Sequence, residues 1–377
     1  MPSRILVLAK GFPPTTGGVE TYSEQVARAY LRRGLEVVVL TQTDGPQGWT
    51  DRRTPDGSLR LWNAGGGGQL TVFARMLRAA LKLRQDTDLA AVHSTTWRVG
   101  LVGDMVFPGI PRVVTVHGRE VLNFPPGAGI AMRRVLRKAS LVLAVSQATL
   151  RVALAASRQG ASPKWVVAHN GLTDEARARA SLRQPTESTV RVLALCRLVP
   201  RKNIVHAVAA VASLPTATAE QLDFRIAGRG PEQSSIQSAI ETAELSSHVR
   251  MLGYVPDEDV PQLYEWADIF VHPHSHTGEG SDFEGFGIAI ADAMAYGCAV
   301  VSGRDGGPLD FVIDGETGLL VDGNETSEIA AALQTLIDEP SLRATLAGRG
   351  KAYALENFSW NHHIEPVVET LTREKAR

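Results

Sequence analysis

Short apolar runs rich in β-branched residues recur along the chain, separated by stretches long enough for a helix. In the first half these runs are ILVLA (5–9), VVVLT (37–41), AAVHS (90–94), RVVTVH (112–117), LVLAVS (141–146) and WVVAHNG (165–171). Strands that are apolar on both faces and are joined by helices pair in parallel within a helix-covered sheet. The first half therefore predicts a doubly wound α/β domain.

A polar stretch, TDEARARASLRQPTEST, interrupts this alternation, and a second series of runs follows it. They are VRVLALCRL (190–198), FRIAGRG (224–230), VRMLG (249–253), IFVHPH (269–274), AVVSG (299–303) and TGLLVD (317–322). A chain of 377 residues is also too long for one ordinary core. We expect a domain over 1–185, a second over 186–357, and a helix over 358–377 that begins near an N-cap at Ser359 and packs back on the first domain.

The composition narrows the class of protein. A hydrophobic fraction of 44% and a charged fraction of 21% are typical of a globular protein. The start MPSRILVLAK runs into a strand pattern without a signal-peptide region, and no run of apolar residues is long enough to span a membrane, so we expect a cytoplasmic protein. Only Cys196 and Cys298 occur, which argues against a disulfide scaffold or a zinc ribbon.

Charge is divided unevenly between the halves. Residues 1–190 hold 25 Lys and Arg against 13 Asp and Glu, a net charge of +12, and the remainder holds 14 against 27, a net charge of −13. Either the first half meets an anionic partner or the two halves attract each other. Both interpretations stay open.

The loop after the first run, KGFPPTTGGVE, lacks the spacing of a dinucleotide-binding turn, and no P-loop motif occurs in the chain. Gly17 and Gly18 stand immediately before a predicted helix. Free amides at a helix start can bind an anion, although glycines there also suit a turn that needs positive φ.

Two further segments contain candidate binding or catalytic residues. CRLVPRKNI places Arg197 and Lys202 after a predicted strand, where they can neutralise a diphosphate leaving group or form an ordinary basic turn. FEGFGIAIADAMAYG places Glu284 in a glycine turn, where its carboxylate can accept hydrogen bonds from sugar hydroxyls. Asp292, eight residues on, lies about two helical turns away and can reach ribose hydroxyls. Acids suit a helix start, which explains Glu284 but not Asp292.

Together these segments resemble a known family. The motifs are GGVE (17–20), VHG (116–118), HNG (169–171), RLVPRKN (197–203), IAGRGPE (226–232), LGYVP (252–256), EGFGIAIADAMAYG (284–297) and GGPLDFVIDGETGLLVD (306–322). They are similar to those of family 4 glycosyltransferases, and the similarity runs from the first strand to FSW at 358–360. It implies the GT-B fold, in which two doubly wound Rossmann-like domains face each other across a cleft.

The resemblance also implies an activity. It is the retaining transfer of a sugar from a nucleotide-diphosphate sugar, UDP-linked by preference and GDP-linked as the other choice, to an acceptor hydroxyl in glycan, glycolipid or metabolite biosynthesis. No cofactor or divalent metal is implied. The implied route to retention is attack on the same face of the sugar, aided by the leaving phosphate.

Site residues follow from the same motifs. Arg197 and Lys202 match the donor-diphosphate pair, Glu284 the acid beside the donor sugar, and His117 a histidine near the sugar. The other implied donor contacts are Gly17 and Gly18 in the loop over the phosphates, Tyr254 and Val255 at the nucleobase, Gly285, Phe286, Gly287 and Ile288 in the phosphate-binding turn, and Asp292 at the ribose. Asp292, His169 and Asp310 depart from the usual glutamate, proline and glutamate, and Asp292 puts donor affinity in question.

Other interpretations remain. His272, His274 and His276 can lie on one side of an extended strand and bind a metal, but we favour loop or substrate-lining histidines. The arginine-rich segments 73–85 and 131–138 suit a phospholipid surface or a phosphorylated acceptor, or are ordinary amphipathic helices over a sheet. No nucleic acid partner is expected. Two other hypotheses are a nucleotide-sugar binding protein without catalysis and a GT-B epimerase.

Overall fold

The computed structural model describes residues 4–15, 17–86, 88–122, 124, 127–160, 162, 164–179, 189–276 and 282–375. The chain divides into two compact units, residues 1–171 with 359–377, and residues 172–358. The boundary expected at 185/186 lies outside the described residues, and the units divide at residue 171 instead. Residues 172–179, which the sequence assigned to the first domain, therefore belong to the second unit.

The sheet of the first unit has the strand order β3-β4-β2-β1-β5-β6-β7-β8. Its strands are β1 (Arg4–Leu8), β2 (Glu36–Thr41), β3 (Gly48–Thr54), β4 (Gly57–Asn63), β5 (Ala91–Ser94), β6 (Arg112–Val116), β7 (Leu141–Ala144) and β8 (Trp165–Val167). The six predicted strands are present and pair in parallel. The hairpin of β3 and β4 was not predicted, and β3 pairs antiparallel with β4. The apolar-run criterion missed it because most of β3 is exposed and polar.

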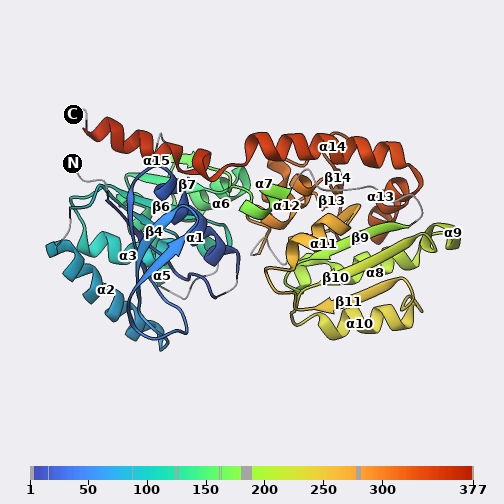
Figure 1. Ribbon diagram of the computed structural model, residues 1–377, viewed down its shortest axis with the longest axis horizontal. Helices are drawn as coiled ribbons and strands as arrows, with labels where there is room; N and C mark the ends of the chain where they lie inside the picture. Colours follow the sequence, from blue (N-terminus) through green and yellow to red (C-terminus); the bar gives the residue numbers. More distant parts are fainter. Residues whose placement is uncertain are drawn as a thin grey trace. The chain divides into compact units, whose positions relative to one another are not determined.

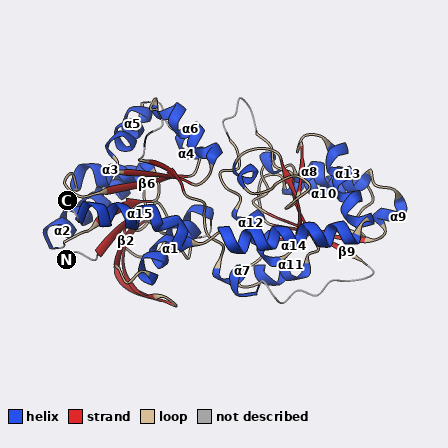
Figure 2. Ribbon diagram, turned by 90° about the horizontal axis from the view of Figure 1, so that it is seen from above, coloured by secondary structure: helices blue, strands red, loops and turns tan. Residues whose placement is uncertain are grey.

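Helices cover both faces of this sheet, as Figure 2 shows. They are α1 (Gly18–Arg32), α2 (Gln69–Asp86), α3 (Trp97–Val106), α4 (Arg119–Leu122), α5 (Ala128–Lys138), α6 (Gln147–Ser157) and α15 (Trp360–Lys375). Alternation along β1 decides which helix each residue meets: Ile5 and Val7 pack with α1 and α15, whereas Leu6 and Leu8 pack with α2 and α3. Apolar residues at consecutive positions of a strand are therefore all buried.

Helix α15 belongs to the first unit although it ends the chain (Figure 1). Ser359 caps its start, because the N–H of Asn361 donates to Ser359 Oγ at 3.2 Å. Trp360 and Ile364 are buried in the same core as α1 and β1. His363 lies 2.7 Å from the Tyr22 hydroxyl of α1. The segment is thus held by apolar packing and by a buried hydrogen bond.

The second unit holds a parallel sheet in the order β11-β10-β9-β12-β13-β14. Its strands are β9 (Val190–Leu195), β10 (Leu222–Ala227), β11 (Val249–Gly253), β12 (Ile269–His272), β13 (Ala299–Gly303) and β14 (Leu319–Val321). All six were predicted, and all pair in parallel. The prediction of two doubly wound α/β units is confirmed.

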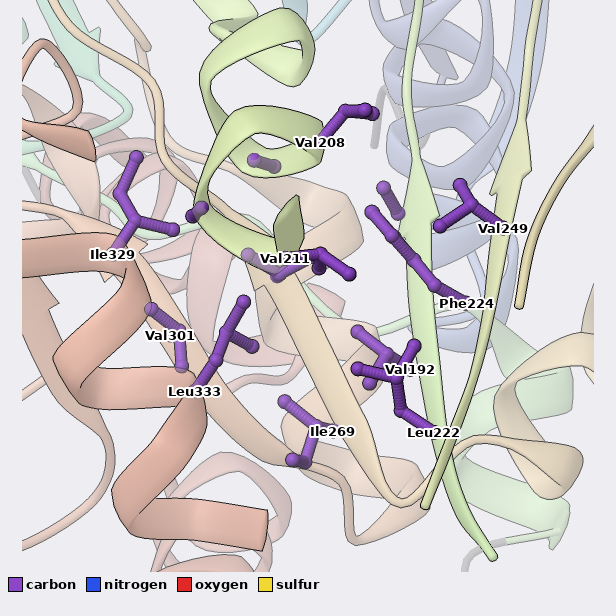
Figure 3. Close-up of a cluster of buried hydrophobic side chains, with 14 of the residues drawn as sticks. Val192, Val208, Val211, Leu222, Phe224, Val249, Ile269, Val301, Ile329 and Leu333 are labelled. Carbon is purple, nitrogen blue, oxygen red and sulfur yellow. The ribbon is translucent and has the colours of Figure 1, made fainter. Parts of the chain in front are cut away.

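The helical segments of the second unit again lie on both faces of its sheet. They are α7 (Asp174–Arg179), η1 (Pro200–Lys202), α8 (Ile204–Ala212), α9 (Thr216–Ala219), α10 (Gln233–Thr242), α11 (Val260–Trp266), α12 (Ile288–Tyr296), η2 (Gly307–Asp310), α13 (Thr326–Asp338) and α14 (Pro340–Asn357). Figure 3 shows one face, where Val208 of α8 and Leu333 of α13 share a core with Val192 of β9. On the other face, Tyr264 of α11 lies 5.8 Å from Phe270 of β12, ring centre to ring centre.

Among the described residues, no helix combines the length and the apolar character needed to cross a membrane.

Candidate active site

The predicted donor residues follow the carboxyl ends of strands in the second sheet. β9 is followed by β10 on one side and β12 is followed by β13 on the other, so the strand order reverses between β9 and β12. Open α/β sheets bind ligands outside the carboxyl ends of the strands at such a switch point. Lys202 follows β9, and His272 is the last residue of β12.

Local backbone structure positions Lys202. It ends the 3₁₀ turn η1, and Asn203 adopts left-handed φ and ψ of 52° and 34° before α8 begins. The Asn203 side chain donates to Ser275 Oγ at 2.8 Å, which ties this turn to the segment after β12. Lys202 is only 7% exposed. A buried ammonium needs fixed partners.

Those partners include Glu284. Lys202 Nζ and Glu284 Oε2 form an ion pair, and Arg201 Nη1 donates to the same oxygen at 2.8 Å. Arg201 Nε also lies 3.4 Å from Asp282 Oδ1. Burial favours a neutral Glu284, but Lys202 and Arg201 outweigh it and hold the pKa of this carboxyl well below its usual range. Glu284 is therefore an ionised acceptor between two cations.

Sequence reasoning named Lys202 and Glu284 but missed Arg201 and Asp282. The available signal was adjacency, since Arg201 precedes Lys202 and Asp282 lies two residues before Glu284. Adjacency did not decide which of the two basic residues would meet the acid. In the structure both do.

Two histidines complete this cluster. His272 Nε2 lies 2.9 Å from Lys202 Nζ, and His272 Nδ1 lies 3.0 Å from His274 Nδ1. The disfavoured alternative, in which three histidines share one strand face, does not hold, because β12 ends at His272. His276 is exposed and faces Asp305 at 3.6 Å.

A glycine turn places the start of α12 beside this cluster. Gly287 is the N-cap of α12, with a φ of 91° that side chains rarely adopt. The N–H of Gly307 donates to Glu284 O at 2.8 Å, which fixes the backbone around Gly285 and Phe286. The N–H of Ile290 donates to Gly287 O at 3.0 Å, whereas the earlier amides of α12, at Ile288 and Ala289, have no acceptor within the helix and can bind an anion.

The remaining predicted donor residues of this unit also follow the carboxyl ends of strands in the second sheet. Arg197 follows β9, is exposed, and has no ion pair with any described residue. Tyr254 follows β11 and is 48% exposed, and the Arg229 guanidinium lies 5.3 Å from its ring centre. Val255 is half-buried beside it. The donor-binding roles of Arg197, Tyr254 and Val255 stay predictions.

Asp292 has a hydrogen-bond partner within the second unit. Its carboxylate is 5% exposed and accepts a hydrogen bond from the backbone N–H of Thr173 at 3.1 Å. Burial raises the pKa of Asp292 to about 7, although the Thr173 hydrogen bonds oppose this shift. Its partner Thr173 lies in the segment that enters the second unit, and the ribose contact of Asp292 stays a prediction.

The first unit carries Gly17, Gly18 and His117. Gly17 is the N-cap of α1 and Gly18 is its first residue, so the predicted helix begins one residue earlier than expected. His117 follows β6, and its Nε2 lies 2.8 Å from the Thr95 carbonyl oxygen, so Nε2 carries a proton. Its ring packs edge-on against Tyr22 with centroids 4.6 Å apart. A neutral His117 therefore keeps Nδ1 as its remaining acceptor.

Comparison with known families and proteins identifies the class of enzyme. The family described as glycosyl transferases group 1 matches residues 175–353, and the family described as glycosyltransferase family 4 matches residues 16–176. With the two Rossmann-like units, these matches define an enzyme that transfers glycosyl groups. The chain belongs to glycosyltransferase family 4 and has the GT-B fold.

Several relatives match over most or all of their length. A GDP-mannose-dependent α-(1-6)-phosphatidylinositol monomannoside mannosyltransferase of Mycolicibacterium smegmatis is 29% identical, over 99% of this chain and 100% of its own. A D-inositol 3-phosphate glycosyltransferase of Acidothermus cellulolyticus is 29% identical over 93% of this chain and 84% of its own.

Solved structures support the fold. HepE of Anabaena, in complex with UDP and glucose, has a TM-score of 0.74 at 23% identity and covers 98% of this chain and 99% of its own. Sucrose-phosphate synthase of Thermosynechococcus elongatus has a TM-score of 0.78 at 21% identity, with 99% of each chain covered.

Proposed function

We propose that this glycosyltransferase moves mannose, with retention, from GDP-mannose to a hydroxyl of an inositol-phosphate glycolipid. The observation that carries the proposal is the end-to-end similarity to relatives described as GDP-mannose-dependent phosphatidylinositol monomannoside mannosyltransferases. This replaces the preference for a UDP-linked donor that the sequence suggested. GDP and UDP share the diphosphate, so the predicted cationic site serves either donor.

The cluster around Lys202 suits a diphosphate leaving group. As the bond between the anomeric carbon and the phosphate oxygen breaks, negative charge grows on the leaving diphosphate. The Lys202 ammonium, the Arg197 guanidinium and the first amides of α12 are the groups that would stabilise that charge. Glu284, held ionised by Lys202 and Arg201, would accept hydrogen bonds from sugar hydroxyls.

The ion pairs of the Glu284 carboxylate also bear on the configuration of the product at the anomeric carbon. Two cations share this carboxylate, which lowers its reactivity toward the anomeric carbon. We therefore infer that the acceptor hydroxyl attacks from the face that the diphosphate leaves. The acceptor proton would pass to the departing phosphate oxygen, and the configuration at the anomeric carbon is kept. This route needs no divalent metal.

The first unit supplies features that suit an anionic lipid surface. Ile130 of α5 is 69% exposed, and Arg133 and Arg137 line the same cavity of about 310 Å³, together with Arg158 after α6. An exposed apolar residue among arginines suits peripheral contact with anionic lipid. Flotation with anionic and neutral liposomes tests this part, and binding should be lost in an Arg133→Glu, Arg137→Glu double variant. No flotation of the wild type at low salt contradicts it.

The activity itself is tested with a donor panel. The purified enzyme is incubated with GDP-mannose, UDP-glucose or UDP-N-acetylglucosamine and a phosphatidylinositol monomannoside acceptor, and nucleotide release is measured with excess EDTA present. We expect transfer from GDP-mannose and an α-linked product by NMR. Transfer only from a UDP-sugar overturns the donor assignment, a β-linked product overturns retention, and loss of activity in EDTA overturns metal independence.

A further inference from the structure

The segment VHPHSH places two buried histidines beside Lys202. His272 ends β12, His274 lies two residues further on, and both side chains are buried. Their ring centroids are 5.0 Å apart, and the His272 ring also stacks on Phe270 at 6.2 Å. The family motifs discussed above assign no role to this pair.

Hydrogen-bond partners decide which nitrogen of each ring carries the proton. His274 Nε2 lies 2.7 Å from Asp305 O, which can only accept, so this nitrogen donates. Nδ1 of a neutral His274 is then an acceptor, and it lies 3.0 Å from His272 Nδ1, which must donate. His272 Nε2 is left as the acceptor for Lys202 at 2.9 Å. The two rings have opposite tautomers.

A competing contact does not change this assignment. His274 Nδ1 also lies 3.0 Å from His272 O, which would suit a proton on Nδ1. In a neutral ring, that proton would leave Nε2 and Asp305 O as two acceptors facing each other at 2.7 Å. The longer contact is therefore the one left without a hydrogen.

The surroundings of the pair favour neutral rings. Burial and the charge of Lys202 lower the pKa of His272 well below its usual range. Burial also lowers the pKa of His274, against the opposing charge of Glu284. Arg201 is a further cation that opposes protonation of His272. All four ring nitrogens have partners, so neither ring has a free lone pair for a metal.

We propose that His272 and His274 are positioning residues that hold the Lys202 ammonium through a chain of hydrogen bonds ending at the Asp305 carbonyl. An ammonium has three N–H donors. One meets His272 and one meets Glu284, which leaves the third for the donor diphosphate. The inference rests on the proposed function, because the third donor has this use only if a diphosphate binds here.

The choice of histidine has a physical reason. A neutral imidazole accepts from the ammonium without cancelling its charge, whereas a second carboxylate would cancel it. Anchoring the chain on a backbone carbonyl fixes both rings, and with them the direction of the Lys202 side chain. A lysine without this anchor would have to lose rotamer freedom when the donor binds.

A spectroscopic test detects this chain of hydrogen bonds without any assay of activity. Long-range ¹H–¹⁵N spectra of histidine-labelled enzyme at pH 7 should show His272 as the Nδ1–H tautomer and His274 as the Nε2–H tautomer. Variants His272→Gln and His274→Gln assign the signals by their loss. Identical tautomers in the two rings, or a charged ring at pH 7, would contradict the proposed chain of hydrogen bonds.

A kinetic test uses four variants with GDP-mannose. Removing the partner that orients a reactive group typically costs about 10- to 100-fold in activity at metal sites, and we expect a similar loss in kcat for His272→Leu and His274→Leu. His272→Gln should recover most of the kcat, because its amide oxygen can accept from Lys202. The exposed His276→Asn, on the same segment, serves as the matched control and should stay within about twofold of wild type.

The outcomes separate this inference from the proposed function. A wild type that transfers sugar while His272→Leu keeps full kcat overturns the positioning role and leaves the function standing. If the wild type is inactive with every nucleotide-sugar, the proposed function is overturned. The tautomers of His272 and His274 still show whether the chain of hydrogen bonds exists. If His272→Leu unfolds by circular dichroism, His272→Gln decides: a kcat no better than that of His274→Leu contradicts the proposal.

Discussion

Lys202 and Glu284 each bind more than one partner in the second unit. Lys202 meets Glu284 and His272, and Glu284 also meets Arg201. Removing one member of such a group leaves buried charge on the others. We therefore expect substitutions of these side chains to change stability as well as turnover, and each variant must be assayed for both.

Lys202→Ala should lower kcat with GDP-mannose by about a hundredfold or more, because a donor that stabilises the leaving charge is lost. Glu284→Gln should also lower turnover, while Arg250→Ala, an exposed arginine of β11, should leave it unchanged. Steady-state kinetics and thermal unfolding of each variant make the comparison. Wild-type turnover in both Lys202→Ala and Glu284→Gln would remove the site assignment.

Asp292 should make the protein less stable at high pH. Its folded pKa of about 7 lies above its ordinary value of 3.8, so the folded state binds the proton more tightly than the unfolded chain does. Stability therefore falls as pH rises from 4 to 7, by at most about 4 kcal/mol. Asp292→Asn keeps an acceptor for Thr173 and should flatten this slope, as measured by urea unfolding at pH 5 and 8. An equal slope in wild type and variant contradicts the burial argument.

Residue type and spacing predicted part of this cluster. Lys202, Glu284 and the glycines around them belong to recognisable motifs, so they could be named. Arg201 and the histidine pair could not be assigned roles, because which side chains meet across the turn depends on the approach of η1 to the end of β12. That approach is made by tertiary hydrogen bonds such as Asn203 to Ser275.

At the scale of elements, α12 depends on the backbone of Gly287. Its φ of 91° is one that an L-residue rarely adopts, and an added Cβ would lie 3.0 Å from Pro308 Cγ. Gly287→Ala should cost about 1–2 kcal/mol of stability and raise the KM for GDP-mannose, because the first amides of α12 shift. Chemical denaturation and steady-state kinetics measure the two effects. Gly315→Ala, in an open turn with similar φ, is the control: it should lose stability without a change in KM.

Helix α15 is held by a buried histidine that must stay neutral. His363 Nδ1 lies 3.0 Å from Ala168 O and so donates to it, and Nε2 accepts from the Tyr22 hydroxyl. Burial lowers the pKa of His363 to about 4. As pH falls from 6.5 to 4, the unfolded chain binds a proton that the folded state does not, so stability falls over this window.

The size of this effect is at most about 3 kcal/mol, from the difference between the two pKa values. In His363→Gln the free energy of unfolding should be lower at pH 7.5 and should depend less on pH between 4 and 6.5 than in wild type. Urea titrations at several pH values give both quantities. A pH slope unchanged by the substitution would place the acid sensitivity elsewhere, for example at His93, whose pKa burial lowers to about 3.

At the scale of the whole molecule, the charge asymmetry follows the two units. Residues 1–171 with 359–377 hold 25 basic and 13 acidic side chains, so the first unit carries +12 and the second −13. The unit that holds the proposed diphosphate site is thus the acidic one. Local cations and helix amides, not net charge, must attract the donor there.

GDP at 100 times its dissociation constant should add about 2.7 kcal/mol to the stability of the folded protein. Hydrogen exchange with mass spectrometry should locate the protection at 197–204 and 284–296, where the cationic turn and the start of α12 lie. UMP, which lacks the second phosphate and the guanine base, is the control nucleotide. Protection confined to the first unit would show that the nucleotide binds elsewhere.

The sequence by itself determined the strands that carry apolar residues on both faces, the division into two α/β units and the family motifs. Those features depend on local periodicity and on residue type, which the sequence displays directly. Only the tertiary structure decided that β3 and β4 form a hairpin, that Arg201 shares Glu284 with Lys202, and that Asp292 accepts a hydrogen bond from Thr173. The physical reason is the same in each case: burial and hydrogen-bond partners come from segments distant in sequence, and no local pattern specifies their approach.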